Sequence, residues 1–269
     1  MPRCAVIGHP VAHSLSPALH RAAYAALGLD WTYSAMDVEP GGAAEFIAGL
    51  DESWRGLSVT APHKDDLVNC GDPDQVVTLT GAANTWVRTE TGAIVRNTDV
   101  PGYGVALAAH GIKGLRSATV IGNGATARSA VAGLARAGVD EVQVLARRPE
   151  RATGLVELAT TLGLSSTVTT LGAPSPSTDI VVSTIPAAGP ATHADAVAAL
   201  APVVFDSVYD PWPTPLAAAA HQRGALVLNG LDLLAGQAVE QIRWMTGGEV
   251  TFELLRAAAR DAMAARSQL

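Results

Sequence analysis

Cysteine is scarce in this sequence, and a long apolar run is missing. Cys4 and Cys70 are the only cysteines among 269 residues, and they form no CxxC motif or cysteine–histidine cluster. We therefore expect two reduced thiols, as in a cytosolic protein, rather than a disulfide or a metal site. No stretch approaches the roughly 20 apolar residues of a membrane span, and the N-terminus lacks the long apolar segment of a signal peptide. These absences predict a cytoplasmic protein with no membrane partner.

Positive charge is also scarce. The chain has 18 Lys and Arg against 25 Asp and Glu, a net charge of −7, and its longest basic run is the pair Arg147 and Arg148. Because binding to a phosphate backbone requires a cationic surface, we expect no nucleic acid partner. Of the seven histidines only His9 and His13 have the HxxxH spacing, and no HExxH motif is present. We therefore predict no metal site, and a metal-dependent hydrolase is disfavoured.

Apolar residues are abundant, at 48% against 16% charged residues, so the chain can bury a sizeable core. Short β-branched runs alternate with alanine-rich helical segments, which predicts an α/β fold with parallel strands covered by helices. The predicted strands are 4–7, 32–38, 57–60, 118–121, 142–146, 167–170, 180–183, 203–206 and 225–228. The main predicted helices are 17–27, 125–137, 148–162, 231–245 and 250–266.

The alternation is interrupted near residue 100 and near residue 230, which predicts two domains. Residues 102–236 would form a Rossmann-type nucleotide-binding domain. Residues 1–101 would form a mixed α/β substrate domain, completed by the C-terminal helices 237–269. A cleft between two domains is the usual place for a ligand. The alanine-rich surface permits a homodimer without specifying its interface.

A glycine-rich turn follows the predicted strand 118–121. The run Gly122-Asn123-Gly124-Ala125-Thr126-Ala127 is a GxGxxA motif between a strand and a helix. Gly122 permits a tight turn, Gly124 lets a pyrophosphate approach the backbone, and the helix N-terminus offers free N–H groups. The alternative is an ordinary glycine-rich turn. The strand and helix on either side favour a dinucleotide site.

The residues at the end of the next strand indicate which dinucleotide the site would bind. A site for NAD usually has Asp or Glu there, about 20 residues further on, to bind the ribose 2′-hydroxyl. This chain has Arg147 and Arg148, with Arg151 close behind. An arginine pairs with a 2′-phosphate through charge-assisted hydrogen bonds, so NADP is favoured over NAD. A solvated basic turn is the alternative.

Three polar segments in the first hundred residues are candidates for a substrate site. In 13–17, Ser16 before Pro17 is typical of a helix N-cap. The hydroxyls of Ser14 and Ser16 could equally donate hydrogen bonds to a substrate carboxylate. In 58–64, we expect Pro62 to begin a helix with Lys64 in its first turn and His63 to be structural. The third candidate pairs 81–85 with 97–99, and Asp99 is expected to pair with Lys64. An exposed lysine and local turn roles for Asn97 and Asp99 are the alternatives.

These segments together resemble the shikimate dehydrogenase family, over nearly the whole chain and in the family's order. The matching elements are 8–17, 59–64, 81–85, 97–99, 122–128, 206–211 and 230–237. The GxGxxA loop is generic, whereas the HSLSP, TxPxK and NTD elements are specific to this family. This chain departs from the family pattern at three places: Ser58 replaces the usual Asn, 146–148 is Ala-Arg-Arg instead of Asn-Arg-Thr, and Val100-Pro101 replaces the usual glycine.

The resemblance implies NADPH-dependent reduction of 3-dehydroshikimate to shikimate, a step towards chorismate and aromatic amino acids. It implies that Lys64, assisted by Asp99, exchanges the proton while hydride moves between nicotinamide and substrate. Ser14 and Ser16 would hold the substrate carboxylate. The other implied substrate contacts are Thr60, Asn84, Tyr209 and Gln237.

The resemblance also implies a set of NADP contacts. The implied pyrophosphate contacts are Gly122, Asn123, Gly124, Ala125 and Thr126. The implied 2′-phosphate contacts are Arg147, Arg148 and Arg151, and Ser207 and Gly230 would lie along the nicotinamide half. Two rival functions are an NAD-dependent quinate/shikimate dehydrogenase and a non-catalytic nucleotide or metabolite sensor on the same fold. The arginines weigh against the first, and the Lys64 and Asp99 pair weighs against the second.

Overall fold

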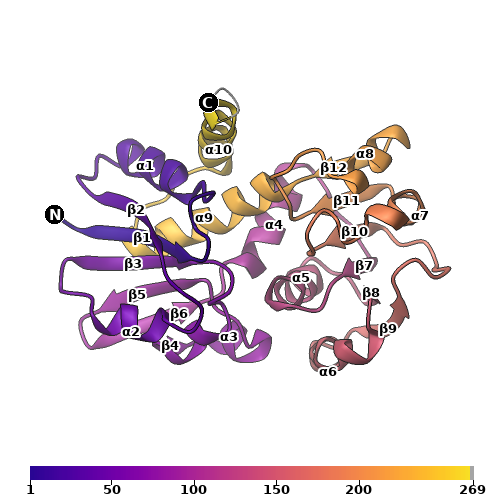
Figure 1. Cartoon of the computed structure of the whole chain (residues 1–269), viewed down its shortest axis with the longest axis horizontal. Coiled ribbons are helices and arrows are strands. Elements are labelled where there is room, and N and C mark those ends of the chain that lie inside the picture. The colour runs from indigo at the N-terminus through magenta and orange to yellow at the C-terminus, as the bar shows by residue number, and fades with distance from the viewer. Residues whose placement is uncertain (267–269) are drawn as a thin grey trace. The chain divides into compact units, whose positions relative to one another are not determined.

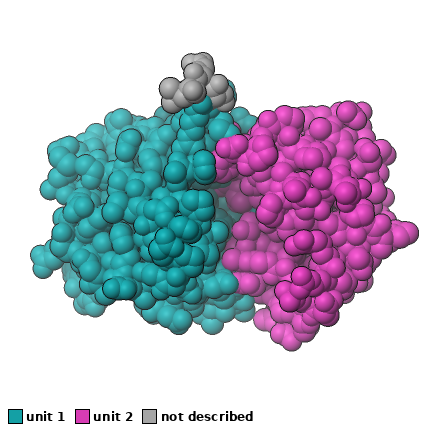
Figure 2. Space-filling model, in the orientation of Figure 1, with its two compact units in different colours: residues 1–105, 234–269 teal, residues 106–233 magenta. Residues whose placement is uncertain are grey.

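The computed structural model describes residues 1–266, which fold as two compact units. The first unit contains residues 1–105 and the C-terminal segment from Leu234, and the second contains residues 106–233. Figure 2 shows them in teal and magenta. The chain passes from one unit to the other inside α4 (Asp99–Ala109) and returns inside α9 (Gly230–Thr246). Within residues 1–266, no helix has the length and apolar character needed to span a membrane.

The first unit contains a mixed six-stranded sheet in the order β2-β1-β3-β5-β6-β4. β1 pairs in parallel with β2 and β3, whereas β5 runs antiparallel to both β3 and β6. The strands are β1 (Arg3–Gly8), β2 (Thr32–Asp37), β3 (Trp54–Val59), β4 (Asp72–Pro73), β5 (Thr85–Thr89) and β6 (Gly92–Arg96). The helices, including the short 3₁₀ helix η1, are α1 (Ser16–Ala26), α2 (Ala43–Ala48), η1 (Asp66–Asn69), α3 (Gln75–Thr80) and α10 (Phe252–Arg266).

The second unit contains a six-stranded parallel sheet in the order β12-β11-β10-β7-β8-β9. This is the doubly wound Rossmann order, in which the sequence of strands reverses between β7 and β10. The strands are β7 (Ser117–Ile121), β8 (Glu141–Ala146), β9 (Ser165–Thr170), β10 (Ile180–Ser183), β11 (Val203–Asp206) and β12 (Leu226–Leu228). The helices are α5 (Ala125–Arg136), η2 (Pro149–Ala152), α6 (Thr153–Thr161), η3 (Ala191–His193), α7 (Ala194–Ala198) and α8 (Pro215–Gln222).

The strand predictions follow burial closely. All nine predicted strands are present with small shifts at their ends, and β10 and β11 are buried along most of their length. Strands that are buried on both faces read as continuous apolar runs, which is why they were visible in the sequence. The β5–β6 hairpin was missed because its arginine and threonine residues obscure the apolar pattern. Figure 1 shows this hairpin beside β3.

Two helix predictions are wrong at their starts. The single helix predicted over 148–162 is divided into η2 and α6. Ser16 is not an N-cap, because α1 begins at Ser16 itself and Leu15 occupies the cap position without a side-chain hydrogen bond. The Oγ of Ser14 instead accepts a hydrogen bond from the backbone N–H of Ser16 over 3.3 Å.

Two glycines let α4 and α9 approach each other within the first unit. A Cβ atom on Gly236 would lie 2.4 Å from the carbonyl oxygen of Gly102, and one on Gly102 would lie 2.8 Å from the backbone nitrogen of Gln237. Both obstacles are backbone atoms, which cannot rotate away. The contact places Gln237 of α9 against Gly102, which lies three residues after Asp99 on α4. Pro101 is tolerated in α4 because it lies in the first turn of the helix, where a missing N–H costs no hydrogen bond.

Replacing Gly236 with alanine should therefore destabilise the fold. We expect a loss of about 1–3 kcal/mol in the free energy of unfolding, the usual effect of an overpacked contact. Gly104→Ala on α4 is the matched control, because a Cβ there meets nothing within 4 Å. That change should be neutral or stabilising by about 0.5–1 kcal/mol, since alanine favours helix more than glycine does. Urea denaturation compares the two variants, and equal effects would contradict the close crossing.

Candidate active site

The directions in which the strands pair bring four strand ends to one edge of the first sheet. β1, β3 and β6 run in the same direction, and β5 runs in the opposite direction. The carboxyl ends of β1, β3 and β6 therefore share an edge with the amino end of β5. The loop 9–15, which we call the serine loop, follows β1, and Lys64 follows β3. Asn84 directly precedes β5, and Asp99 follows β6.

Lys64 and Asp99 form an ion pair at this edge. The Nζ of Lys64 lies 2.5 Å from Oδ2 of Asp99. The Lys64 side chain is 16% exposed and that of Asp99 is 5% exposed. The ammonium group is therefore accessible to a small molecule, whereas the carboxylate lies mostly behind it. The predicted pairing is present, and it provides a cation that a buried anion holds in one position.

The chain around Lys64 is a turn and not the predicted helix. Residues 61–65 form turns, and η1 begins only at Asp66. The carbonyl oxygen of Lys64 accepts a hydrogen bond from the backbone N–H of Ala83 over 2.8 Å. A helix would need that carbonyl for its own ladder, so the bond to the neighbouring segment replaces helical structure. His63 is fully buried and its Nε2 bonds the carbonyl oxygen of Val38 over 2.8 Å, as expected for a structural residue.

Asn84 connects the ion pair to α9. Its Nδ2 donates to Oδ1 of Asp99 over 3.0 Å and to Oε1 of Gln237 over 3.1 Å. Its Oδ1 accepts from the backbone N–H of Thr98 over 2.8 Å and from the hydroxyl of Thr85 over 2.9 Å. The structure therefore brings Lys64, Asp99, Asn84 and Gln237 together. Both oxygens of Asp99 have a donor, which holds this carboxylate in one orientation.

Thr60 follows β3 directly and lies against the start of the serine loop. Its backbone N–H donates to the carbonyl oxygen of Ile7 over 2.9 Å. A Cβ on Gly8 would lie 2.4 Å from Cγ2 of Thr60, so glycine is required there for Thr60 to approach β1. The half-buried Thr60 side chain therefore lies at the same edge as Lys64.

The serine loop is attached to the rest of the first unit on two sides. Arg266 at the end of α10 donates to the carbonyl oxygens of His13 and Ser14 over 2.7 and 2.8 Å. On the other side, Oδ2 of Asp37 accepts from the backbone N–H of Val11 over 3.0 Å. Arg266 and Asp37 lie in no motif, so the sequence alone does not mark them. Their contacts give the serine loop, which carries Ser14 and leads directly into Ser16, a defined position.

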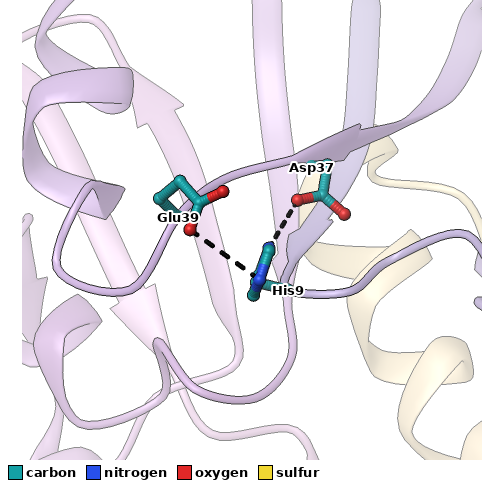
Figure 3. Close-up of side chains that lie close together, drawn as sticks. All are labelled: His9, Asp37 and Glu39. Carbon is teal, nitrogen blue, oxygen red and sulfur yellow. Dashed lines mark hydrogen bonds and ion pairs between the residues drawn. The ribbon is translucent and has the colours of Figure 1, made fainter.

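His9 lies between two carboxylates at the base of this loop (Figure 3). Its Nδ1 is 2.7 Å from Oδ1 of Asp37, and its Nε2 is 3.7 Å from Oε2 of Glu39. The three side chains offer ligand atoms within 4.8 Å of one another, and all three are exposed. Each ring nitrogen faces a different carboxylate, which suits a protonated imidazole bridging two anions. The hydrogen bond that His9 donates to Asp37 raises the pKa of His9 above 6.5 and lowers the pKa of Asp37 below 3.8.

These two pKa shifts predict a pH window for the stability of the serine loop. Because the pKa of His9 is raised, its contribution is complete below the unfolded value of 6.5 and is lost as pH rises through the folded value. The lowered pKa of Asp37 sets the acidic limit, since its contribution is lost as pH falls through the folded value. His9→Asn should therefore reduce the free energy of unfolding more at mildly acidic pH than at alkaline pH. Chemical denaturation across that range, repeated with Asp37→Asn, checks this, and a pH-independent difference would contradict it.

The glycine loop of the second unit lies at the point where the strand order reverses. Gly122 has φ +117°, and a Cβ there would lie 2.5 Å from Oγ1 of Thr184, which follows β10. A Cβ on Gly124 would meet no atom within 4 Å, so that face of the loop is open. Gly124 is the N-cap of α5. The first N–H groups of α5, at Ala125 and Thr126, have no partners within the helix, which makes them suitable donors to a pyrophosphate.

A pocket of about 140 Å³ lies beside this loop, entirely within the second unit. Arg147, Arg148 and Arg151, which we call the basic turn, line it together with Gly122 and Asn123. The Nδ2 of Asn123 donates to the carbonyl oxygen of Arg151 over 2.9 Å, so the glycine loop and the basic turn are bonded to each other. The carboxyl ends of β7, β8 and β10 all reach this region, which is where doubly wound sheets bind ligands. The donors present fit a phosphorylated dinucleotide.

Ser207, Tyr209 and Gly230 also come together in the second unit. A Cβ on Gly230 would lie 2.4 Å from the carbonyl oxygen of Ser207 and 2.9 Å from Cδ1 of Tyr209. The buried Asp206 shapes this segment by accepting from the hydroxyl of Thr214 over 2.6 Å. Burial raises the pKa of the Asp206 carboxyl, and its hydrogen bonds to Thr214 and Val208 partly offset that effect. Tyr209, an implied substrate contact, thus belongs to the unit that carries the glycine loop.

Family models match both units of the chain. The model described as "Shikimate dehydrogenase substrate binding domain" matches residues 6–86. The model described as "Shikimate / quinate 5-dehydrogenase" matches residues 106–206. A curated protein of Moorella thermoacetica, named shikimate dehydrogenase (NADP(+)), is 35% identical over 98% of this chain and 94% of its own. The chain belongs to the shikimate dehydrogenase family.

Other members of the family agree in sequence and in fold. The shikimate dehydrogenase (NADP(+)) of Citrifermentans bemidjiense is 41% identical over 90% of this chain and 89% of its own. The crystal structure of Mycobacterium tuberculosis shikimate dehydrogenase matches with a TM-score of 0.89 at 38% identity, covering 97% of this chain and all of that one. The Thermus thermophilus enzyme, solved in complex with NADP(H) and shikimate, matches with a TM-score of 0.84 at 31% identity over the same fractions. The predicted fold class and family resemblance are confirmed.

Proposed function

We propose that this member of the shikimate dehydrogenase family catalyses the NADPH-dependent, reversible reduction of 3-dehydroshikimate to shikimate. The reaction is a step towards chorismate and the aromatic amino acids. The names of the curated relatives support both the oxidoreductase activity and NADP as cofactor. The Thermus thermophilus structure supports shikimate as the substrate. The single observation in this chain that carries the proposal is the ion pair between Lys64 and Asp99.

The ion pair suits the proton transfer that accompanies ketone reduction. Bound NADPH supplies the hydride, and the oxygen left on the substrate needs a proton and a stabilising positive charge. Lys64 provides both as a positioned general acid, and Asp99 holds its ammonium group in place. In the reverse direction Lys64 accepts the hydroxyl proton. Asn84 and Gln237 contact the neighbouring ring hydroxyls, Thr60 assists them, and Ser14 and Ser16 bind the carboxylate.

The proposed cofactor contacts follow from the glycine loop and the basic turn. The backbone of Gly122, Asn123, Gly124, Ala125 and Thr126 would hold the pyrophosphate. Arg147, Arg148 and Arg151 would hold the 2′-phosphate, and Ser207 and Gly230 would line the nicotinamide half. Residues 102–236 would then be the NADP domain, and residues 1–101 with 237–269 the substrate domain.

A spectrophotometric assay of the purified chain tests the function. Shikimate and NADP should give reduced nicotinamide, and kcat/KM should be higher with NADP than with NAD and higher with shikimate than with quinate. A preference for NAD and quinate would make the chain a quinate/shikimate dehydrogenase. No turnover with any of these pairs would overturn the proposal in favour of a non-catalytic sensor. The cytoplasmic location and a homodimer stay predictions, which cell fractionation and sedimentation equilibrium test.

A further inference from the structure

Helix α9 carries two glutamines, one turn apart, that contact the candidate active site. Gln237 bonds Asn84 directly, as described above. Gln241 lies four residues further along on the same face of the helix and is only 1% exposed. The substrate cannot reach so buried a side chain, and no motif of the sequence includes it. Gln241 nevertheless makes four hydrogen bonds, and two of them go to Asn84 and Thr85.

The partners of Gln241 fix the orientation of its amide. Its Nε2 lies 3.2 Å from the carbonyl oxygen of Asn84, and a carbonyl oxygen can only accept. The amide nitrogen must therefore face Asn84, and it also donates to Oγ1 of Thr85 over 3.1 Å. The Oε1 on the other side accepts from the hydroxyl of Ser58 over 2.8 Å and from Nε2 of His20 over 3.3 Å. Both hydrogens and both lone pairs of the amide are used.

The groups on the far side of Gln241 from Asn84 support the same orientation of its amide, with Oε1 facing them. His20 is fully buried, and burial lowers its pKa to about 3, so its ring is neutral. Because Oε1 of Gln241 only accepts, Nε2 of His20 carries the ring hydrogen. The hydroxyl of Tyr33 donates to Oγ of Ser58 over 2.6 Å, which leaves the Ser58 hydrogen for Gln241. Ser58, which stands where the family often has Asn, thus accepts a hydrogen bond from Tyr33 and donates one to Gln241.

The chain continues through Thr85 to the ion pair. Oγ1 of Thr85 accepts from Gln241, and the Thr85 hydroxyl lies 2.9 Å from Oδ1 of Asn84, to which it can donate. That contact and the N–H of Thr98 turn the oxygen of Asn84 away from Asp99. The amide nitrogen of Asn84 then faces Asp99 and Oε1 of Gln237. Gln237 is left with its Nε2 as the end available to a ligand.

We propose that Gln241 is a positioning residue that holds the backbone of Asn84 and the hydroxyl of Thr85 from behind, and so fixes the place from which Asn84 and Gln237 contact the substrate. The proposal rests on the proposed function, because the substrate is shikimate or 3-dehydroshikimate. Gln237 presents an N–H donor, so it recognises an oxygen that accepts a hydrogen bond. Without Gln241, the carbonyl oxygen of Asn84 and the hydroxyl of Thr85 lose a buried donor, so the segment that carries Asn84 is held less firmly behind the ion pair, although Thr98 still orients the Asn84 amide.

Two variants that break the same link test the proposal. Gln241→Met removes the amide and keeps the side-chain length, and Thr85→Val keeps the shape and removes the hydroxyl. Each should raise the KM for shikimate about tenfold, the size expected when one buried hydrogen bond is lost, and leave the KM for NADP unchanged. The double variant should be no worse than either single variant, because both interrupt one chain. A merely structural role would lower the active fraction without changing the KM for shikimate.

Tyr24→Phe is the matched control. Tyr24 packs in the same core cluster as Tyr33, and within residues 1–266 its hydroxyl makes no hydrogen bond to any member of the chain that runs through Gln241. This variant should leave the KM for shikimate unchanged. Effects of Gln241→Met and Thr85→Val that multiply, or an unchanged KM in both, would overturn the proposal. If Gln241→Met does not fold, the KM for shikimate of Thr85→Val decides alone. Failure of the proposed function is distinguishable, because the unmodified chain would then show no turnover.

Discussion

Lys64→Ala is expected to lower kcat for shikimate oxidation by about 10² to 10⁴, the range that positioned general acids and bases supply. The structure gives the physical reason. The Lys64 ammonium is held 2.5 Å from a buried carboxylate, and alanine leaves no group at that position to exchange the proton. The KM for shikimate should change far less, because the ring and carboxylate contacts are intact. Steady-state kinetics with shikimate and NADP measure both quantities.

The chain offers a convenient control for this experiment. Lys113 is its only other lysine, and it is exposed in the second unit. Lys113→Ala removes the same charge and should leave kcat unchanged. Asp99→Asn keeps the shape of the partner side chain and removes its charge, so it should lower kcat in the same direction as Lys64→Ala. An unchanged kcat in Lys64→Ala would remove this residue from the mechanism.

The parts of this site that were predictable are those encoded by local sequence. Lys64, Asn84 and Asp99 each lie beside a strand end, and short motifs mark them. The sequence also placed the glycine loop correctly between β7 and α5, because a tight turn after a buried strand demands glycine at a position such as Gly122. Local patterns are sufficient wherever one residue type is required by the conformation of its own segment.

The rest of the site depends on partners distant in the sequence. Gln241 bonds Asn84 across 157 residues, and Arg266 bonds Ser14 across 252 residues. No local pattern distinguishes these side chains from other polar residues on amphipathic helices. The helix predicted at Pro62 fails for the same reason, because the carbonyl of Lys64 bonds Ala83 from another segment. Tertiary contacts override local preference at these positions.

The basic turn should determine cofactor choice. Arg147 and Arg151 line the pocket beside the glycine loop, and we expect each to pair with a 2′-phosphate. A hydrogen bond to a charged group contributes about 1.5–3 kcal/mol, which corresponds to roughly 10- to 150-fold in affinity. Arg147→Ala and Arg151→Ala should each raise the KM for NADP within that range. The KM for NAD should stay the same, because NAD has no 2′-phosphate, so the preference for NADP in kcat/KM should fall by the same factor.

Arg136→Ala is the control for this prediction, since Arg136 is an exposed arginine at the far end of α5 from the glycine loop. It removes one positive charge from the second unit without touching the pocket. If it weakened NADP as much as the basic-turn variants do, general electrostatic attraction would explain the preference. If none of the three changed the KM for NADP, the basic turn would be a solvated surface. If only the Arg147 and Arg151 variants raise the KM for NADP, direct contact with the phosphate explains the preference. Ionic screening weakens the general field of the protein's charges, whereas it weakens a paired, partly desolvated contact much less.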